Sequence, residues 1–176
     1  MYRKPACPKP PIASGRDALA EAAKKYKLEE KLDTGSFGQV YRGTMTDGTA
    51  VAIKAFHQGS AGNQEANEEA AIADLVRHPA VVRLLDAFLQ KERVHLVYEL
   101  ARQDLYRFLK ASAKPLETER IRITSLQILT ALVHIHLCGL VHTDVKPANI
   151  LVRSTSPWAC LLGDVGSAVE VRLASL

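Results

Sequence analysis

Apolar and polar residues alternate over several short segments in the first half of the chain. Residues 26–32 follow this pattern, residues 40–44 continue it after a glycine-containing turn, and residues 49–56 come after an Asp-Gly pair typical of hairpins. Apolar runs at 81–88 and 93–100, separated by polar residues, predict two further strands. These segments together predict an antiparallel sheet of five strands.

A helical period interrupts this series of strands at residues 62–77. The apolar stripe of this helix is formed by Ile72, Leu75 and Val76, and the His-Pro pair at 78–79 ends it. Two acidic residues, Glu68 and Glu69, lie on the side of the stripe. Periodicity alone does not choose between them.

The second half of the chain is mainly helical. One helix is predicted to start near Gln103, and a long one to run from Glu117 to Cys138 before Gly139. A loop at 141–149 then leads to short strands at 150–152 and 159–163. The apolar residues expected on one face of the long helix are Ile121, Ile128, Leu129, Leu132 and Ile135.

Strands followed by helices predict an α+β fold, with a sheet lobe first and a mainly helical lobe second. Residues 1–25 are expected to form a proline-rich, basic leader that ends in a short helix at 16–25. Residues 26–100 are then expected to form the sheet lobe, and residues 101–176 the helical lobe.

Composition excludes several classes of protein. The chain has 176 residues, 47% hydrophobic and 24% charged, which are ordinary globular values. Its net charge of +4 arises in residues 1–31, so a basic nucleic-acid-binding surface is not expected. Three cysteines without paired spacing do not indicate disulfides or a zinc site, and no apolar run is long enough for a membrane span. An intracellular protein, cytoplasmic or nuclear, is expected.

The predicted sheet carries two features that suit a phosphate. Gly35 and Gly38 lie in the turn between its first two strands, where backbone amides can approach an anion closely. Alternation in the third strand places Ala52 and Lys54 on the same face. A lysine in an apolar strand needs a counter-charge or an anionic ligand. A simple hairpin and an edge-strand lysine are the alternatives.

The most specific stretch is Val-His-Thr-Asp-Val-Lys-Pro-Ala-Asn-Ile-Leu at 141–151. Asp144 can accept a proton, Lys146 can neutralise a phosphate, and Asn149 can bind Mg²⁺ through its amide oxygen. A second carboxylate, Asp164, follows between glycines at 163 and 166. Oxygen ligands of this kind suit Mg²⁺ that is shared with nucleotide phosphates.

In this order, the motifs resemble those of the eukaryotic protein kinases. The resemblance runs from Tyr26 to the end of the chain, and the Asp-x-Lys-Pro-x-Asn pattern is that of serine/threonine kinases. Residues 78–88 and 96–105 are similar to cyclin-dependent and related kinases. The resemblance implies a five-stranded antiparallel N-lobe with one helix and an incomplete, mainly helical C-lobe.

The resemblance also implies ATP as a ligand. Gly35 and Gly38 would cover its phosphates, and Lys54 would bind them while paired with Glu69, since the family spaces that glutamate ten residues before the proline at 79. The other ATP-binding residues that it implies are Val40, Ala52, Glu99, Ala101, Asp104 and Leu151.

The catalytic and metal-binding roles follow from the same resemblance. Asp144 would orient and deprotonate the acceptor hydroxyl beside Lys146, while Asn149 and Asp164 would hold Mg²⁺. The implied function is ATP-dependent phosphoryl transfer to serine or threonine hydroxyls of a protein whose identity the sequence does not give.

Several residues depart from the family pattern and keep an alternative open. Asp33 stands in place of a glycine, Thr143 in place of an arginine and Val165 in place of a phenylalanine. The activation segment and the substrate-binding helices have no counterpart before Leu176, so a truncated domain is expected. The alternative function is a pseudokinase-like module for nucleotide binding or scaffolding. A partner is expected to cover the wide apolar face of the helix at 117–138.

Overall fold

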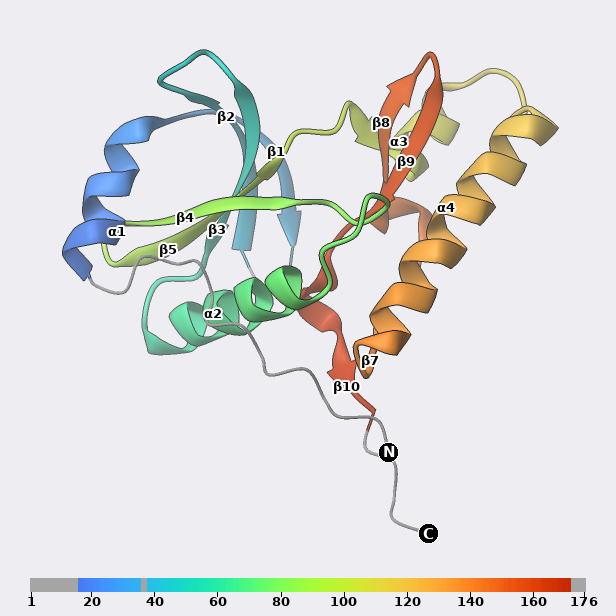
Figure 1. The fold of residues 1–176 in the computed structure, drawn as a ribbon. Coiled ribbons are helices and arrows are strands. Elements are labelled where there is room, and N and C mark those ends of the chain that lie inside the picture. The colour runs from blue at the N-terminus through green and yellow to red at the C-terminus, as the bar shows by residue number, and fades with distance from the viewer. Residues whose placement is uncertain (1–15, 36–37, 172–176) are drawn as a thin grey trace, which may run out of the picture. The chain divides into compact units, whose positions relative to one another are not determined.

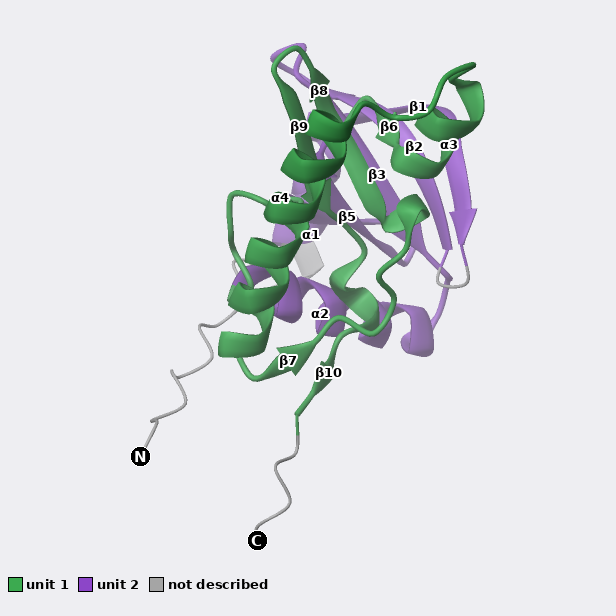
Figure 2. Cartoon of the chain, turned by 90° about the vertical axis from the view of Figure 1, so that its right-hand side faces the viewer, with its two compact units in different colours: residues 1–7, 75–82, 101–176 green, residues 8–74, 83–100 purple. Residues whose placement is uncertain are grey.

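The computed structural model describes residues 16–35 and 38–171, which form two compact units. The sheet unit contains the described residues up to 74 together with 83–100, and the helical unit contains 75–82 together with 101–171. Figure 1 labels the helices and strands, and Figure 2 colours the sheet unit purple and the helical unit green. The proline-rich leader at 1–15 and the tip of the glycine turn at 36–37 lie outside the described residues.

The sheet unit is built on a five-stranded sheet in the order β1-β2-β3-β5-β4, and every neighbouring pair is antiparallel. This confirms the predicted antiparallel sheet and, with its one long helix, the α+β expectation for this lobe. The strands are β1 (Tyr26–Gly35), β2 (Gly38–Met45), β3 (Ala50–Phe56), β4 (Leu84–Gln90) and β5 (Arg93–Glu99). The helices are α1 (Arg16–Ala22), the 3-10 turn η1 (Ala23–Lys25) and α2 (Ser60–Leu75).

A hydrophobic core lies on one face of this sheet, where α1 packs against β4 (Figure 1). The Tyr26 ring stacks on Phe88 with 5.1 Å between centroids, and its hydroxyl donates to Asp86 at 2.7 Å. In β3, Val51 and Ile53 are fully buried on this side, whereas Ala52 and Lys54 are half-buried on the other. The period of two in β3 therefore separates a structural face from the face that carries the lysine.

Helix α2 buries small residues rather than the predicted stripe. Its buried positions are Gly62, Ala66, Glu69, Ala70 and Ala73, while Ile72 and Leu75 are only half-buried. A Cβ at Gly62 would lie 2.0 Å from the carbonyl oxygen of His57, so the helix begins in close contact with the chain that leaves β3. Val76, the third residue of the predicted stripe, directly follows the helix and is fully buried, so the stripe is covered only in part.

The helical unit combines two α-helices with short strands. Its elements are β6 (Gln103–Asp104), α3 (Leu105–Ala111), α4 (Thr118–Leu137), β7 (Leu140–Val141), η2 (Pro147–Asn149), β8 (Ile150–Thr155), β9 (Trp158–Leu162), η3 (Val165–Ser167) and β10 (Val169–Glu170). The helix predicted to start near Gln103 begins at Leu105, because Gln103 and Asp104 form β6, which pairs with β8, and Asp104 caps α3. Residues 81–83 are not part of β4; instead Val81 forms a parallel bridge with Leu162.

Helix α4 buries part of the predicted apolar face and leaves the rest of it exposed. Thr124, Ile128, Ala131 and Ile135 are its buried residues, and the Trp158 indole of β9 donates to the Thr124 hydroxyl at 2.9 Å. Of the residues predicted to share one apolar face, Ile128 and Ile135 are buried, whereas Ile121 and Leu129 are 51% and 58% exposed. Contacts with β9, which lies far along the chain, decide which side of α4 is covered.

A second apolar row lies on the outside of α4. Exposed apolar side chains form this row; they are Leu126, Leu129, Val133 and Leu137, each at least half exposed.

Within residues 16–35 and 38–171, no helix has the length and apolar character that crossing a bilayer requires.

Candidate active-site residues

In the sheet unit, Lys54 and Glu69 form a buried ion pair. The Lys54 Nζ atom lies 2.5 Å from Oε2 of Glu69, and the side chains are 14% and 4% exposed. The other carboxylate oxygen, Oε1, accepts a hydrogen bond of 2.7 Å from the Tyr98 hydroxyl. Glu69 is thus held by two donors, Lys54 from β3 and Tyr98 from β5. The ion pair in turn keeps the Lys54 ammonium on the half-buried face of β3.

The choice between the two glutamates is now visible. Glu68 is exposed and bonds to Gln64 at 2.8 Å within the same helix, whereas Glu69 points into the protein. Tyr98 is a residue whose contact with Glu69 the sequence did not reveal. It lies opposite Ala52 in the β3–β5 register, so its hydroxyl approaches α2 from the face that carries Lys54.

The glycine turn connects β1 and β2 directly. Gly35 and Gly38 are paired across the hairpin, and Gly38 has a φ of +148°. A Cβ at Gly38 would lie 2.1 Å from the carbonyl oxygen of Ala55, so a side chain there would force the backbone of β2 and β3 apart. Val40 is in register with Lys54, and both are half-buried. Val40, Ala52 and Lys54 therefore belong to one region of the sheet.

The chain leaves the sheet unit after β5 and enters the helical unit at Ala101. Glu99, the last residue of β5, bonds Arg83 twice: its N–H donates to the Arg83 carbonyl at 3.0 Å, and its carboxylate accepts from the Arg83 N–H at 2.9 Å. These bonds fix the end of the strand.

In the helical unit, three predicted site residues form one cluster. Asp144 Oδ2 lies 2.7 Å from the Lys146 ammonium and accepts a hydrogen bond of 2.9 Å from the Asn149 amide. The same amide nitrogen donates to the Asp144 carbonyl at 2.8 Å. The loop therefore folds around its own carboxylate.

The charge of Asp144 is stabilised by these neighbours. The hydrogen bond from Lys146, assisted by the bond from Asn149, holds the pKa of Asp144 below its usual range, and the carboxylate raises the pKa of Lys146 in return. Asp144 is consequently ionised at neutral pH, and its carboxylate can accept a hydrogen bond from a hydroxyl group.

The buried side chain of His142 holds this loop in place through two hydrogen bonds, a role that the sequence did not indicate. It is 1% exposed, and Nε2 lies 2.9 Å from the carbonyl oxygen of Gly163. A carbonyl can only accept, so Nε2 carries the proton and Nδ1 is free to accept from the Asp144 N–H at 3.4 Å. His142 therefore links the Asp144 loop to the residue before Asp164.

The two candidate metal ligands lie at the same end of the β8–β9 hairpin. Ile150 pairs with Leu162, and the Gly163 N–H donates to the Asn149 carbonyl at 2.8 Å, so Asn149 and Asp164 flank the last pair of the ladder. Asp164 has a φ of +54°, a left-handed conformation that non-glycine residues rarely adopt. Such strain concentrates at functional sites.

Asp104 and Leu151 are paired in the β6–β8 register. The Asp104 carboxylate accepts from the Arg107 N–H at 2.8 Å and lies 3.3 Å from the Arg107 guanidinium, so it caps helix α3. Asp104 therefore has a structural role in addition to any contact with a ligand.

Residues 26–175 match the family described as "Protein kinase domain". The "Probable dual specificity protein kinase YAK1 homolog" of Encephalitozoon cuniculi is 35% identical over 163 residues, which cover 90% of this chain and 40% of that protein. The "Serine/threonine-protein kinase SSN3" of Coccidioides immitis is 32% identical over 166 residues, which cover 83% of this chain and 35% of that protein. The chain therefore spans well under half the length of these relatives.

Proposed function

The chain belongs to the protein kinase family, and from this membership we propose that it transfers a phosphoryl group from Mg·ATP to serine or threonine hydroxyls of a protein. The observation that carries the proposal is the cluster of Asp144, Lys146 and Asn149, because it places an ionised carboxylate beside a cation and an amide. The Asp-x-Lys-Pro-x-Asn pattern and the name of the Coccidioides relative support serine and threonine as acceptors.

In the sheet unit, Lys54 is the residue proposed to bind nucleotide phosphates. Its ammonium is kept in place by Glu69, which is itself held by Tyr98. Gly38 lets the first residue of β2 lie close to the backbone of β3. Backbone amides of a glycine-containing turn can approach phosphate oxygens. Val40 and Ala52 supply an apolar surface of the kind that a purine ring needs.

In the helical unit, Asp144 is proposed to accept the proton of the attacking hydroxyl and Lys146 to neutralise phosphate charge. The donor set fits Mg²⁺. The amide nitrogen of Asn149 is bonded to Asp144, which leaves its oxygen for a cation, and Asp164 adds a carboxylate at the same hairpin end. Mg²⁺ bound there would neutralise charge on the phosphates. Phosphate oxygens and water molecules would then supply the remaining ligands of the metal ion.

Nucleotide binding is the first test of the proposal. The affinity of a fluorescent ATP analogue should increase with Mg²⁺ and should fall at least about tenfold in both Lys54→Met and Asp164→Ala. Asp144→Asn is the matched control, since it keeps the shape of the loop and should bind the analogue nearly as well as the wild type. Affinity that ignores Mg²⁺ and both variants would contradict the proposal.

A further inference from the structure

A hollow in the sheet unit is lined by none of the residues proposed to bind the nucleotide or to take part in catalysis. Its volume is about 260 Å³, and its lining comes from all five strands, the loop after β3 and the turn between β4 and β5. Leu28, Tyr41 and Ala55 supply its apolar and aromatic walls. This volume suits one large side chain better than a whole nucleotide, since small-molecule pockets start at about 300 Å³.

The hollow opens on the face of the sheet opposite to Lys54. Tyr41 and Ala55 are the immediate neighbours of Val40 and Lys54 in β2 and β3, and successive residues of a strand point to opposite faces. A ligand in the hollow would therefore leave the proposed phosphate-binding residues untouched.

His95 lies in the hollow as a buried side chain with one unused acceptor. It is 4% exposed, its ring stacks on Phe88 at 4.5 Å, and Nδ1 lies 2.9 Å from the carbonyl oxygen of Arg93. Since a carbonyl only accepts, Nδ1 carries the proton and Nε2 is a bare acceptor. Burial lowers the pKa of His95 to about 4, so the ring stays neutral at physiological pH.

The Nε2 atom of His95 has no hydrogen-bond partner among the described residues. Within the same part of the chain, no fully enclosed side-chain nitrogen or oxygen lacks a partner. Nε2 is therefore not fully enclosed in the core, and His95 is one of the residues that line the hollow. A ligand that brings a hydrogen-bond donor would satisfy it.

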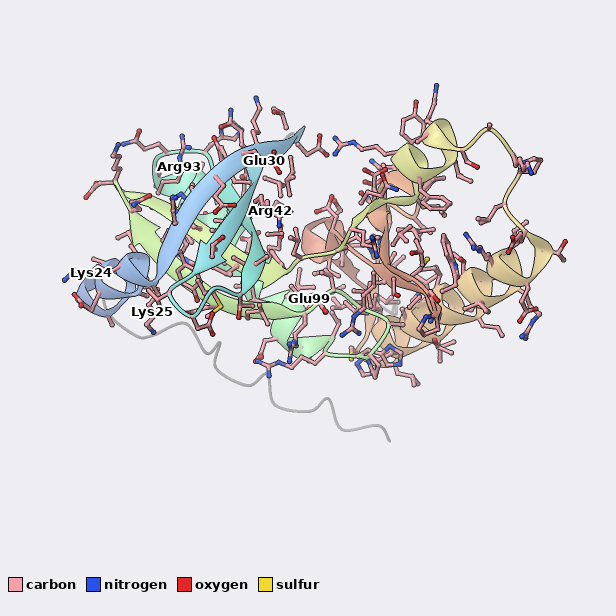
Figure 3. All side chains as sticks on the ribbon, turned by 90° about the horizontal axis from the view of Figure 1, so that it is seen from above. Lys24, Lys25, Glu30, Arg42, Arg93 and Glu99 are labelled. Atoms are coloured by element: carbon pink, nitrogen blue, oxygen red, sulfur yellow. The ribbon has the colours of Figure 1, made fainter. Side chains whose placement is uncertain are left out.

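The rim of the hollow is cationic. Lys91 and Arg93 line it, and none of the described residues that do so is acidic. Gln58 fixes the turn that carries Lys91 by donating to its carbonyl at 3.4 Å, and Asn63 accepts from the Val94 N–H at 3.2 Å. Figure 3 shows Arg93 at the end of β5 opposite Glu99 and away from Lys24 and Lys25.

We propose that this hollow is a docking site for an acidic peptide segment of a partner protein, which inserts a tyrosine side chain. The phenol ring would contact Leu28, Tyr41 and Ala55, and its hydroxyl would donate to Nε2 of His95. Carboxylates next to the tyrosine would pair with Lys91 and Arg93 at the rim. The site is independent of the proposed phosphoryl transfer, because it lies on the other face of the sheet.

The test uses a fluorescein-labelled peptide with one tyrosine between two pairs of glutamates, titrated with the whole chain by fluorescence polarisation. Replacing its tyrosine with phenylalanine should weaken binding about threefold to tenfold, the effect of one hydrogen bond. His95→Phe, which keeps a ring on Phe88, should weaken the tyrosine peptide equally and leave the phenylalanine peptide unchanged. Equal binding of both peptides to the wild type would overturn the proposal.

The rim is tested separately with surface variants that leave the core intact. Arg93→Gln and Lys91→Gln should each weaken the peptide about twofold to fivefold, and added salt should weaken it further. Lys24→Gln is the matched control, because that exposed cation lies outside the hollow and should have no effect. A loss with Lys24→Gln as large as with Arg93→Gln would show nonspecific attraction. Displacement of the peptide by inorganic phosphate alone would identify a simple anion site, and either result would overturn the proposal.

Discussion

Replacing Lys54 with methionine should destabilise the sheet unit strongly, because it leaves Glu69 as a buried anion. The Glu69 side chain is 4% exposed, and its two partners are Lys54 at 2.5 Å and the Tyr98 hydroxyl at 2.7 Å. Removing one member of a buried ion pair costs about 3–5 kcal/mol. The bond from Tyr98 remains, so we expect the lower end of this range, and a melting temperature lower by about 6–12 °C for a protein of this size.

The double variant Lys54→Met/Glu69→Gln decides whether the uncompensated charge is the cause. The amide oxygen of glutamine can still accept from Tyr98, and no anion remains buried, so most of the lost stability should return. Thermal and urea unfolding followed by circular dichroism measure all four proteins of the cycle. A melting temperature of Lys54→Met equal to that of the wild type, or a double variant no more stable than Lys54→Met, would show that Glu69 is not a destabilising buried anion.

Three further predictions concern the turn, the buried histidine and the outside of α4. Gly38→Ala should cost about 1–3 kcal/mol of unfolding free energy because its Cβ would clash with Ala55 O, whereas Gly35→Ala, with open space around it, should be nearly neutral; urea unfolding compares the two. His95 has a pKa of about 4 in the folded protein, below its unfolded value, so the unfolded state takes up the proton first. Stability should therefore fall by at most about 3 kcal/mol as the pH drops from about 6.5 to 4, and His95→Phe should lose this part of the pH dependence. Leu129→Lys with Val133→Glu should reduce dye binding and self-association in gel filtration without lowering the melting temperature, since both side chains are 58% exposed.

The pattern of the sequence was sufficient for the sheet, because its signals are local. Alternation in β3 predicts that Ala52 and Lys54 share a face, and the structure has them half-buried together. Periodicity on α2 could not choose between Glu68 and Glu69, since both lie near the apolar stripe. The choice depended on the family spacing, and in the structure only Glu69 turns inward.

The spacing of apolar and polar residues along the chain could not predict contacts between segments that are distant in the sequence. Helix α4 has apolar residues on two sides, and contact with β9 decides which side is buried. The sequence of the helix alone does not show which side packs against β9. The same holds for the Tyr98 hydroxyl on Glu69 and for His142 on the Gly163 carbonyl, each joining residues more than twenty positions apart. Such bonds follow from the fold and have no local signature.

Transfer of phosphate to a protein can be measured directly. The product of the full open reading frame that contains this chain is incubated with Mg·ATP labelled at the γ-phosphate and a generic protein substrate, and modified residues are identified by mass spectrometry. The account predicts label on serine or threonine and a loss of at least about a hundredfold in Asp144→Asn, which removes the proton acceptor but keeps the loop. Nucleotide binding without any transfer, or transfer that survives Asp144→Asn unchanged, would contradict it.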